Sequence, residues 1–281
     1  MRHSAEKDTQ PTTHGILKPE EAEKAFHLLV HPAHPELRPW IEFYWNVEWD
    51  LGDRQFRQTV VTNPTVDLSF EDDLGTNGPG RFLIVTGVVP RSYHRHLSGR
   101  GDVFAAHFQP AQFRAWWSSG VQALTGRTQR LGDGPRVWEA GAAALLPGLL
   151  DLSFENRVRT MDEFLLDHRP EPDPIADEIQ RLVAVTRQDR SLWDTGVLAG
   201  RRAVSVRTNQ RQFLEYVGVG PKWVVMRHRI QAAIETLDRE RTGGVRQDLT
   251  SLALNLGYYD LAHFSREYAN LIGESPDHYR A

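Results

Sequence analysis

The chain has 281 residues, of which 40% are hydrophobic and 25% charged, with a net charge of −4 and no cysteine. This composition predicts a folded protein of one or two domains and excludes disulfides, thiolate zinc sites and a cysteine nucleophile. Because no apolar run reaches the roughly 18 residues of a membrane helix, and the N-terminus lacks the apolar core of a signal peptide, we expect a cytoplasmic protein with no membrane partner.

The first part of the chain predicts a β-rich domain behind a polar tail. Residues 1–20 are polar, contain Pro and Gly, and predict a mobile tail. Residues 40–49 alternate with period two, which predicts a strand ending at a turn over residues 51–53. The alternation places five apolar side chains on one face: Ile41, Phe43, Trp45, Val47 and Trp49. Further short strands are expected at residues 58–62, 66–70, 82–86 and 103–108, and helices at residues 110–119, 138–150 and 153–168.

Residues 169–174 read Arg-Pro-Glu-Pro-Asp-Pro and predict a stiff linker. It separates a domain over residues 21–168 from a helical domain over residues 175–281. The helical domain carries 15 Lys and Arg against 13 Asp and Glu, a net charge of +2, and the rest of the chain carries −6. Because +2 is only mildly basic, we expect recognition of an anionic partner to depend on a few side chains.

Within the helical domain, a first helix-turn-helix (the first unit) is expected over residues 194–218. Its second helix presents four side chains on the outer face: Arg207, Thr208, Gln210 and Arg211. Asn209 shares the expected core stripe with Val206, Phe213 and Val217. Burying an unpaired amide costs about 1–3 kcal/mol, so we expect Asn209 to be bonded to a backbone group or partly exposed. On spacing alone, exposed arginines are more often simply a solvated face.

One continuous helix is expected from residue 221 to residue 237, with Pro221 in its first turn. Seventeen residues span about 25 Å, so this helix would hold two helix-turn-helix units at a fixed distance. Two recognition helices about 34 Å apart enter successive major-groove segments on one face of DNA. Lys222, near the start of the helix, is a candidate phosphate contact or an ordinary surface lysine.

A second helix-turn-helix (the second unit) is expected over residues 249–273. Asp260 is suited to cap its second helix, and Gly273 and Pro276 to end it. Phe264, Tyr268 and Leu271 form a core stripe together with Leu261, while the other side is narrow enough for a major groove about 12 Å wide. The candidate DNA-binding residues of this unit are Leu261, Ala262, Ser265 and Arg266. An amphipathic helix pair with a solvated arginine explains the periodicity equally well.

The C-terminal motif resembles the signature of AraC-type transcriptional regulators. The resemblance is carried, in order and without gaps, by Gly257-Tyr258, Asp260, His263-Phe264, Arg266, Tyr268, Gly273, Ser275-Pro276 and Tyr279-Arg280. It implies two helix-turn-helix units that bind double-stranded DNA, and it favours Arg211 and Arg266 as the main readers. The first unit departs from the family pattern, which has Leu at position 209 and Ser at position 220. Residues 35–45 and 104–117 resemble, more weakly, the sensor domains of a subgroup of this family.

The remaining motifs give little support to a metal or catalytic site. His94 and His96 lie on one face of an expected strand and His107 could lie on a neighbouring strand, which resembles cupin metal sites, but no Glu follows at a suitable spacing. No nucleophile elbow, phosphate loop or helical His pair occurs. DNA-repair methyl-transfer proteins with a related helix-turn-helix need cysteines that this chain lacks. The tryptophans of the first domain line a ligand pocket or, more commonly, form core.

We therefore expect an α+β protein: a β-rich N-terminal domain with accompanying helices, then an all-α domain of two helix-turn-helix units joined by a long helix. The resemblance implies a sequence-specific transcriptional regulator, without catalytic residues, metal or cofactor. Its expected partners are double-stranded DNA, a small-molecule effector, a second copy in a homodimer, and RNA polymerase if it activates. Two alternatives remain open: a degraded first unit acting through one reader or protein contacts, and an enzyme with an appended helical domain.

Overall fold

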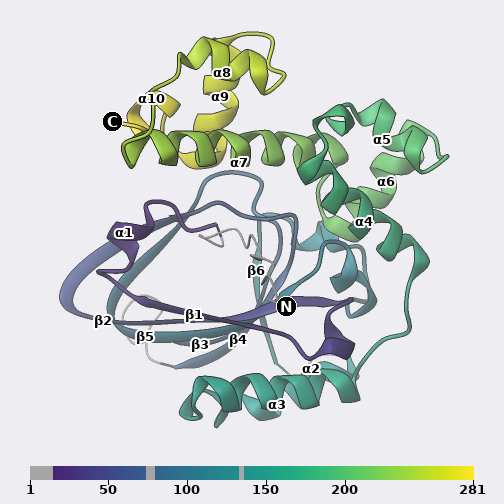
Figure 1. Ribbon diagram of the computed structural model, residues 1–281. Helices are drawn as coiled ribbons and strands as arrows, with labels where there is room; N and C mark the ends of the chain where they lie inside the picture. The colour runs from purple at the N-terminus through teal and green to yellow at the C-terminus, as the bar shows by residue number, and fades with distance from the viewer. Residues whose placement is uncertain (1–14, 74–79, 133–135) are drawn as a thin grey trace, which may run out of the picture.

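The computed structural model describes residues 15–73, 80–132 and 136–281, which fold as a β domain followed by a helical domain (Figure 1). The α+β prediction is confirmed. The strands are β1 His27–Pro32, β2 Ile41–Val60, β3 Asp67–Asp73, β4 Arg81–Thr86, β5 Tyr93–Phe108 and β6 Thr128–Leu131. The helices and turns of the β domain are α1 Pro19–Ala22, η1 Pro35–Leu37, η2 Gln112–Ala115, η3 Val121–Leu124, α2 Val137–Leu145, η4 Leu149–Asp151 and α3 Phe154–Asp167.

The strands form one antiparallel sheet in the order β1-β2-β5-β3-β4-β6. Strand β2 runs through the turn expected at residues 51–53 and absorbs the strand expected at residues 58–62. The chain bends there without ending the strand, because Gly52 adopts φ 56 and the β2–β5 register shifts between Asp50 and Gln55. In Figure 1 both long strands sweep around one side of the sheet.

The alternation in the first half of β2 is confirmed with one exception. Phe43, Trp45, Val47 and Trp49 line a common cavity on one face of the sheet. Ile41 lies in the core on the other face, because the register shifts between Ile41 and Phe43. A shift of one residue turns a strand side chain to the opposite face.

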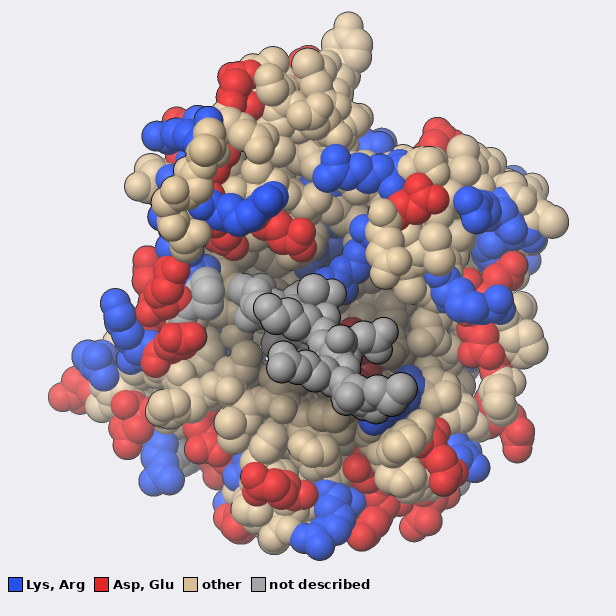
Figure 2. Space-filling model, in the orientation of Figure 1, with Lys and Arg blue, Asp and Glu red and all other residues tan. Residues whose placement is uncertain are grey.

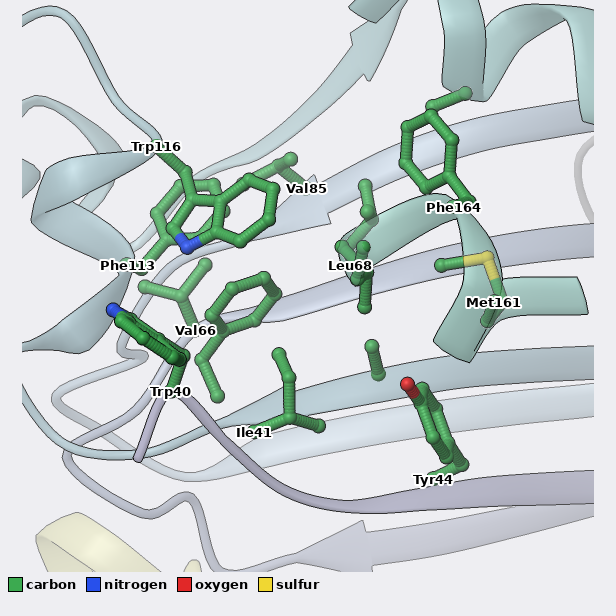
Figure 3. Close-up of a cluster of buried hydrophobic side chains, with 14 of the residues drawn as sticks. Trp40, Ile41, Tyr44, Val66, Leu68, Val85, Phe113, Trp116, Met161 and Phe164 are labelled. Carbon is green, nitrogen blue, oxygen red and sulfur yellow. The ribbon is translucent and has the colours of Figure 1, made fainter. Parts of the chain in front are cut away.

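The other face of the sheet packs on α3 and the short turns, and Figure 3 shows its apolar core. Arg157 on α3 is buried among the sheet residues and donates to both carboxylate oxygens of Asp102, at 2.8 and 2.7 Å, and to Asn46 Oδ1 at 2.5 Å. Tyr44 donates to Asp162 at 2.8 Å. These bonds fix α3 against β2 and β5, which explains why polar residues of β2 are buried.

The helical domain contains α4 Pro174–Gln188, η5 Arg190–Leu192, α5 Thr195–Arg201, α6 Val206–Val217, α7 Pro221–Arg241, α8 Leu249–Asn255, α9 Leu261–Ile272 and α10 Pro276–Tyr279. Helix α7 is 21 residues long, or about 32 Å, somewhat longer than expected. Figure 1 shows α5 and α6 near one end of α7 and α8 to α10 near the other.

Two local expectations need correction. Residues 110–119 form only the short 3-10 turn η2 rather than a helix, since the chain enters it through Ala111 at φ 70. The mobile tail expected over residues 1–20 is wrong at its C-terminal end, where Ile16 bridges to Val60 and Leu17 is buried; residues 1–14 lie outside the described residues. The end of the expected linker caps the next helix, because Asp173 accepts from the N–H of Ile175 at 2.8 Å.

The two domains share apolar cores and hydrogen bonds. Leu17 and Val61 pack with residues of α7, α8 and α9, and Val88 packs with residues of α4 and α7. Trp223 on α7 donates to the carbonyl of Pro90 at 3.1 Å. Movement of the helical domain against the β domain would therefore expose apolar surface. No helix in the described ranges is long and apolar enough to cross a bilayer.

Candidate DNA-binding surface and ligand cavity

The second unit is built by local capping and an aromatic core. Asp260 accepts from the N–H of His263 at 2.6 Å and starts α9, and Gly273 ends it at φ 92. Gly257 supplies the left-handed residue of the turn at φ 77. Phe264 and Tyr268 are fully buried, as the core stripe predicts. Residues of the second unit itself therefore fix the start, the end and the buried face of α9.

The outer face of α9 presents Ala262 and Arg266 to solvent, with Ser265 partly exposed. Within the described residues, Arg266 forms no hydrogen bond or ion pair, so its guanidinium is free to bind a ligand. Leu261 differs from its neighbours because it packs against the core of the unit. It is only partly buried there, and its role as a DNA-binding residue stays a prediction.

The first unit has the same plan. Ser205 caps α6 by accepting from the N–H of Thr208 at 3.1 Å, and its hydroxyl also donates to the Thr208 hydroxyl at 2.9 Å. Arg207, Gln210 and Arg211 are exposed, and in the described ranges neither arginine has a partner. Val206 is 53% exposed rather than part of the core stripe, because the stripe begins only at Asn209.

Asn209 is neither bonded to backbone nor exposed, contrary to both expectations. It is fully buried, and its Oδ1 accepts from Arg202 Nη1 at 2.8 Å. Arg202 also donates to Glu178 at 2.8 Å and to Gln212 at 2.9 Å. Asn209 Nδ2 has no partner in the described residues. A buried polar network thus takes the place of the leucine that the family pattern has at position 209. The sequence signal that could have revealed this network is Arg202, an arginine seven residues before the polar core position.

The helix α7 between the units carries Lys222 on its surface and Arg227 in the interface. Arg227 donates to the carbonyl of Thr62 at 2.6 Å, to Asn63 Oδ1 at 3.0 Å and to Gln231 at 3.0 Å. No carboxylate pairs with it among the described residues, and burial lowers its pKa to about 9. The burial of Arg227 could not be predicted from the sequence, because burial against another domain leaves no local pattern.

The first unit also contacts the β domain beside its recognition face. Arg114 on η2 pairs with Glu215 at 3.4 Å, and the Thr125 hydroxyl donates to the carbonyl of Gly218 at 2.5 Å. A shallow groove brings Gln122 of η3 together with Arg211. Figure 2 shows basic and acidic side chains intermixed on the visible face of the helical domain, which agrees with its charge of +2.

The β domain holds a cavity of about 200 Å³. His107 lines it, whereas His94 does not, so the three histidines of the sequence analysis do not converge. His94 bonds to Thr59 and His107 to Asp67. No group of three metal-ligating side chains occurs in the described residues.

Comparisons with known proteins agree with this architecture. Residues 198–281 match the family described as a helix-turn-helix domain, and residues 29–130 match a domain of unknown function (DUF6597). A stretch of 99 residues is 28% identical to an HTH-type transcriptional regulator of Haemophilus influenzae; it covers 35% of this chain and 32% of that relative.

Crystal structures of ToxT from Vibrio cholerae are also similar. One is 12% identical with a TM-score of 0.43, over 91% of this chain and 98% of that one; another is 11% identical with a TM-score of 0.39, over 92% and 97%. Scores below 0.5 establish no more than a loose likeness. The helix-turn-helix match covers residues 198–281, the part of the chain that carries the AraC-type motif, and supports that resemblance for the helical domain.

Proposed function

We propose that this protein is a sequence-specific regulator of transcription that reads double-stranded DNA with both units. The observation that carries the proposal is the placement of free arginines near both ends of α7: Arg207 and Arg211 on α6, and Arg266 on α9. The length of α7, about 32 Å, is close to the rise of one DNA turn, about 34 Å. A single chain can then read two neighbouring major-groove segments.

The side chains of the two recognition helices take different roles. Arg211 and Arg266 are the base readers, since arginine binds guanine O6 and N7 in a bidentate manner. Gln210, Ala262 and Ser265 complete the reading faces, and Thr208 supports the cap of α6. Arg207 and Lys222 contact phosphate, as exposed basic residues beside a recognition helix commonly do.

The β domain controls this activity through an effector bound in its cavity. Thr62 and Asn63 line the cavity and are also the residues that hold Arg227 of α7. A ligand that shifts this segment changes the position of α7, and with it the spacing of the two units. A homodimer would double the site, and RNA polymerase would be a partner if the protein activates transcription.

Selection of genomic fragments by the full-length protein tests the proposal, followed by affinity measurements on the selected site. We expect Arg211→Ala and Arg266→Ala each to weaken binding by about 1–3 kcal/mol and to relax specificity in one half of the site. Arg181→Ala, which removes an exposed arginine from α4, is the matched control. Random fragments from the selection contradict sequence-specific binding, and a silent Arg211→Ala favours a degraded first unit.

A further inference from the structure

The cavity of the β domain is enclosed by both halves of the β2–β5 ladder. Phe43, Trp45 and Trp49 line it before the register break, and Gln58 and Leu97 line it beyond the break. Figure 1 shows the sweep of these two strands, and residues from both halves of the ladder line the cavity. The lining surface is mainly apolar and rich in aromatic rings, which is typical of small-molecule sites.

One ion pair crosses this cavity. Glu71 on β3 is 4% exposed, and it accepts from Arg95 Nη2 and from Ser69 Oγ at 3.0 Å. Arg95 belongs to the far half of β5, so the pair joins opposite walls. Burial acts to lower the pKa of Arg95, but the Glu71 carboxylate outweighs it and raises that pKa above its usual value. Arg95 therefore stays charged in the cavity wall.

A second pair lies on another part of the wall. Asp67 accepts from His107 Nδ1 at 2.8 Å and from Trp45 Nε1 at 3.0 Å, and His107 Nε2 lies 3.1 Å from the Thr65 hydroxyl. Burial acts to lower the pKa of His107, while Asp67 and, more weakly, Glu42 raise it, with a net increase. His107 also stacks on Phe43 with ring centroids 4.6 Å apart.

Apart from the phenol of Tyr93, these four residues are the titratable groups that line the cavity in the described chain, and within each pair they offset one another. A ligand with a net charge would enter an apolar cavity without a free counter-ion, which is unfavourable unless it breaks a pair. An uncharged ring packs on the tryptophan and phenylalanine side chains and leaves both pairs intact. We propose that the cavity binds an uncharged aromatic compound of one or two rings, with the Arg95–Glu71 pair setting the preference against charge.

This inference names the effector class and so rests on the proposed control by the β domain. It is tested by isothermal titration of the full-length protein with three ligands that share one ring system: indole, indole-3-acetate and tryptamine. We expect indole to bind at one site, and the anionic and cationic analogues to bind at least about 10-fold more weakly. Tighter binding of either charged analogue, or no binding of indole, overturns the proposal.

Charge variants test the role of the pair. Glu71→Gln leaves Arg95 without a counter-ion, so indole-3-acetate should become the preferred ligand; Arg95→Met leaves Glu71 alone, so tryptamine should be preferred. Asp72→Asn makes the same charge change as Glu71→Gln one residue along β3, at a position that does not line the cavity, and should preserve the wild-type order. An unchanged order in both cavity variants contradicts the assignment.

A cavity-filling variant keeps the test decisive if a charge variant does not fold. Val47→Phe fills part of the cavity at a position whose register partners on both adjacent strands, Leu28 and Val103, are apolar, and it should weaken indole binding at least about 10-fold. Unchanged affinity places the ligand elsewhere and overturns the proposal. The titration needs no DNA, so the two proposals can fail separately. If the protein selects specific DNA fragments but does not bind indole, only this inference is contradicted. If it binds indole but selects no specific fragments, only the proposed function is contradicted.

Discussion

The two helix-turn-helix units follow one plan but are stabilised by different chemistry. The second unit turns at a glycine, Gly257, and buries aromatic rings around Phe264. The first unit turns at Ala203 in the left-handed region, φ 51, and buries a polar network around Asn209. The second unit is therefore stabilised by an apolar and aromatic core to which Leu17 and Val61 of the β domain contribute, whereas the first depends on buried hydrogen bonds.

This difference shows where control can act on such a protein. Arg114 and Thr125 of the β domain hold the C-terminal end of α6. In the second unit the β domain contacts the core through Leu17 and Val61 and the end of α9 through Ser92, whose N–H donates to the carbonyl of Asn270 at 3.0 Å. A change in the β domain thus reaches the first unit through side chains near its reading face.

Removal of a core ring is the largest expected change and tests whether the units are separable. Phe213 on α6 and Phe264 on α9 are both buried, and replacement by Ala should cost about 3–5 kcal/mol in either case. Hydrogen exchange should show that Phe213→Ala loosens α5 and α6 while α8 and α9 stay protected, with the converse for Phe264→Ala. Equal loss of protection in both units would show that they form one cooperative block.

Disruption of the polar network comes next. Arg202→Met removes the cation that joins Glu178, Gln212 and Asn209, and leaves the buried amide unpaired. We expect a loss of about 3 kcal/mol in the free energy of unfolding, measured by chemical denaturation. Arg201→Met, one residue earlier and exposed, is the matched control. A loss no larger than that of the control would show that the network does not stabilise the first unit.

Acidification should weaken the first unit selectively. His228 on α7 lies in the half of the domain that packs on α4, and burial, Arg227 and Arg187 lower its pKa to about 3. A lowered folded pKa gives stability that is complete above the unfolded pKa, near 6.5, and is lost as pH falls toward 3. At pH 5 the loss is about 2 kcal/mol.

Unfolding curves of the wild type and His228→Gln between pH 7.5 and pH 5 check this expectation. The variant should lose less stability than the wild type across the interval. A parallel decline of the two proteins would assign the acid sensitivity to other groups.

The smallest expected change concerns the turn of the first unit. Ala203→Gly removes the backbone strain of an alanine in the left-handed region and gives the turn the same residue type as the turn of the second unit at Gly257. A left-handed L-residue costs about 1–2 kcal/mol, partly offset by the flexibility of glycine when unfolded, so the variant should gain about 0.5–1 kcal/mol. Thermal unfolding measures the gain, and Ala199→Gly inside α5 should destabilise instead. A loss in Ala203→Gly would mean that the turn is not strained.

Local sequence signals predicted the elements whose causes are local. The cap at Asp260, the glycine at the end of α9 and the stripe of Phe264 and Tyr268 all follow from spacing within one helix. The continuation of β2 past Gly52 did not follow from local signals. A β-bulge and a turn favour the same residue types, and only the partner strand distinguishes them.

The hydrogen-bond partners of the buried polar side chains were harder to predict from the sequence. The partner of Asn209 comes from another helix, and the partner of Arg227 comes from another domain. The pairing of Arg95 with Glu71 depends on how the β2–β5 ladder curls, which no periodicity encodes. Contacts between elements distant in sequence thus decide which polar residues are buried and which remain free to bind.

Hydroxyl-radical footprinting of the full-length protein on its selected DNA site tests most directly whether both units read DNA. The account predicts two protected segments on one face of the duplex, centred about one helical turn apart. Arg211→Ala should remove protection from one segment and Arg266→Ala from the other. A single protected segment that is lost only with Arg266→Ala would contradict the account, because the first unit would then not read DNA.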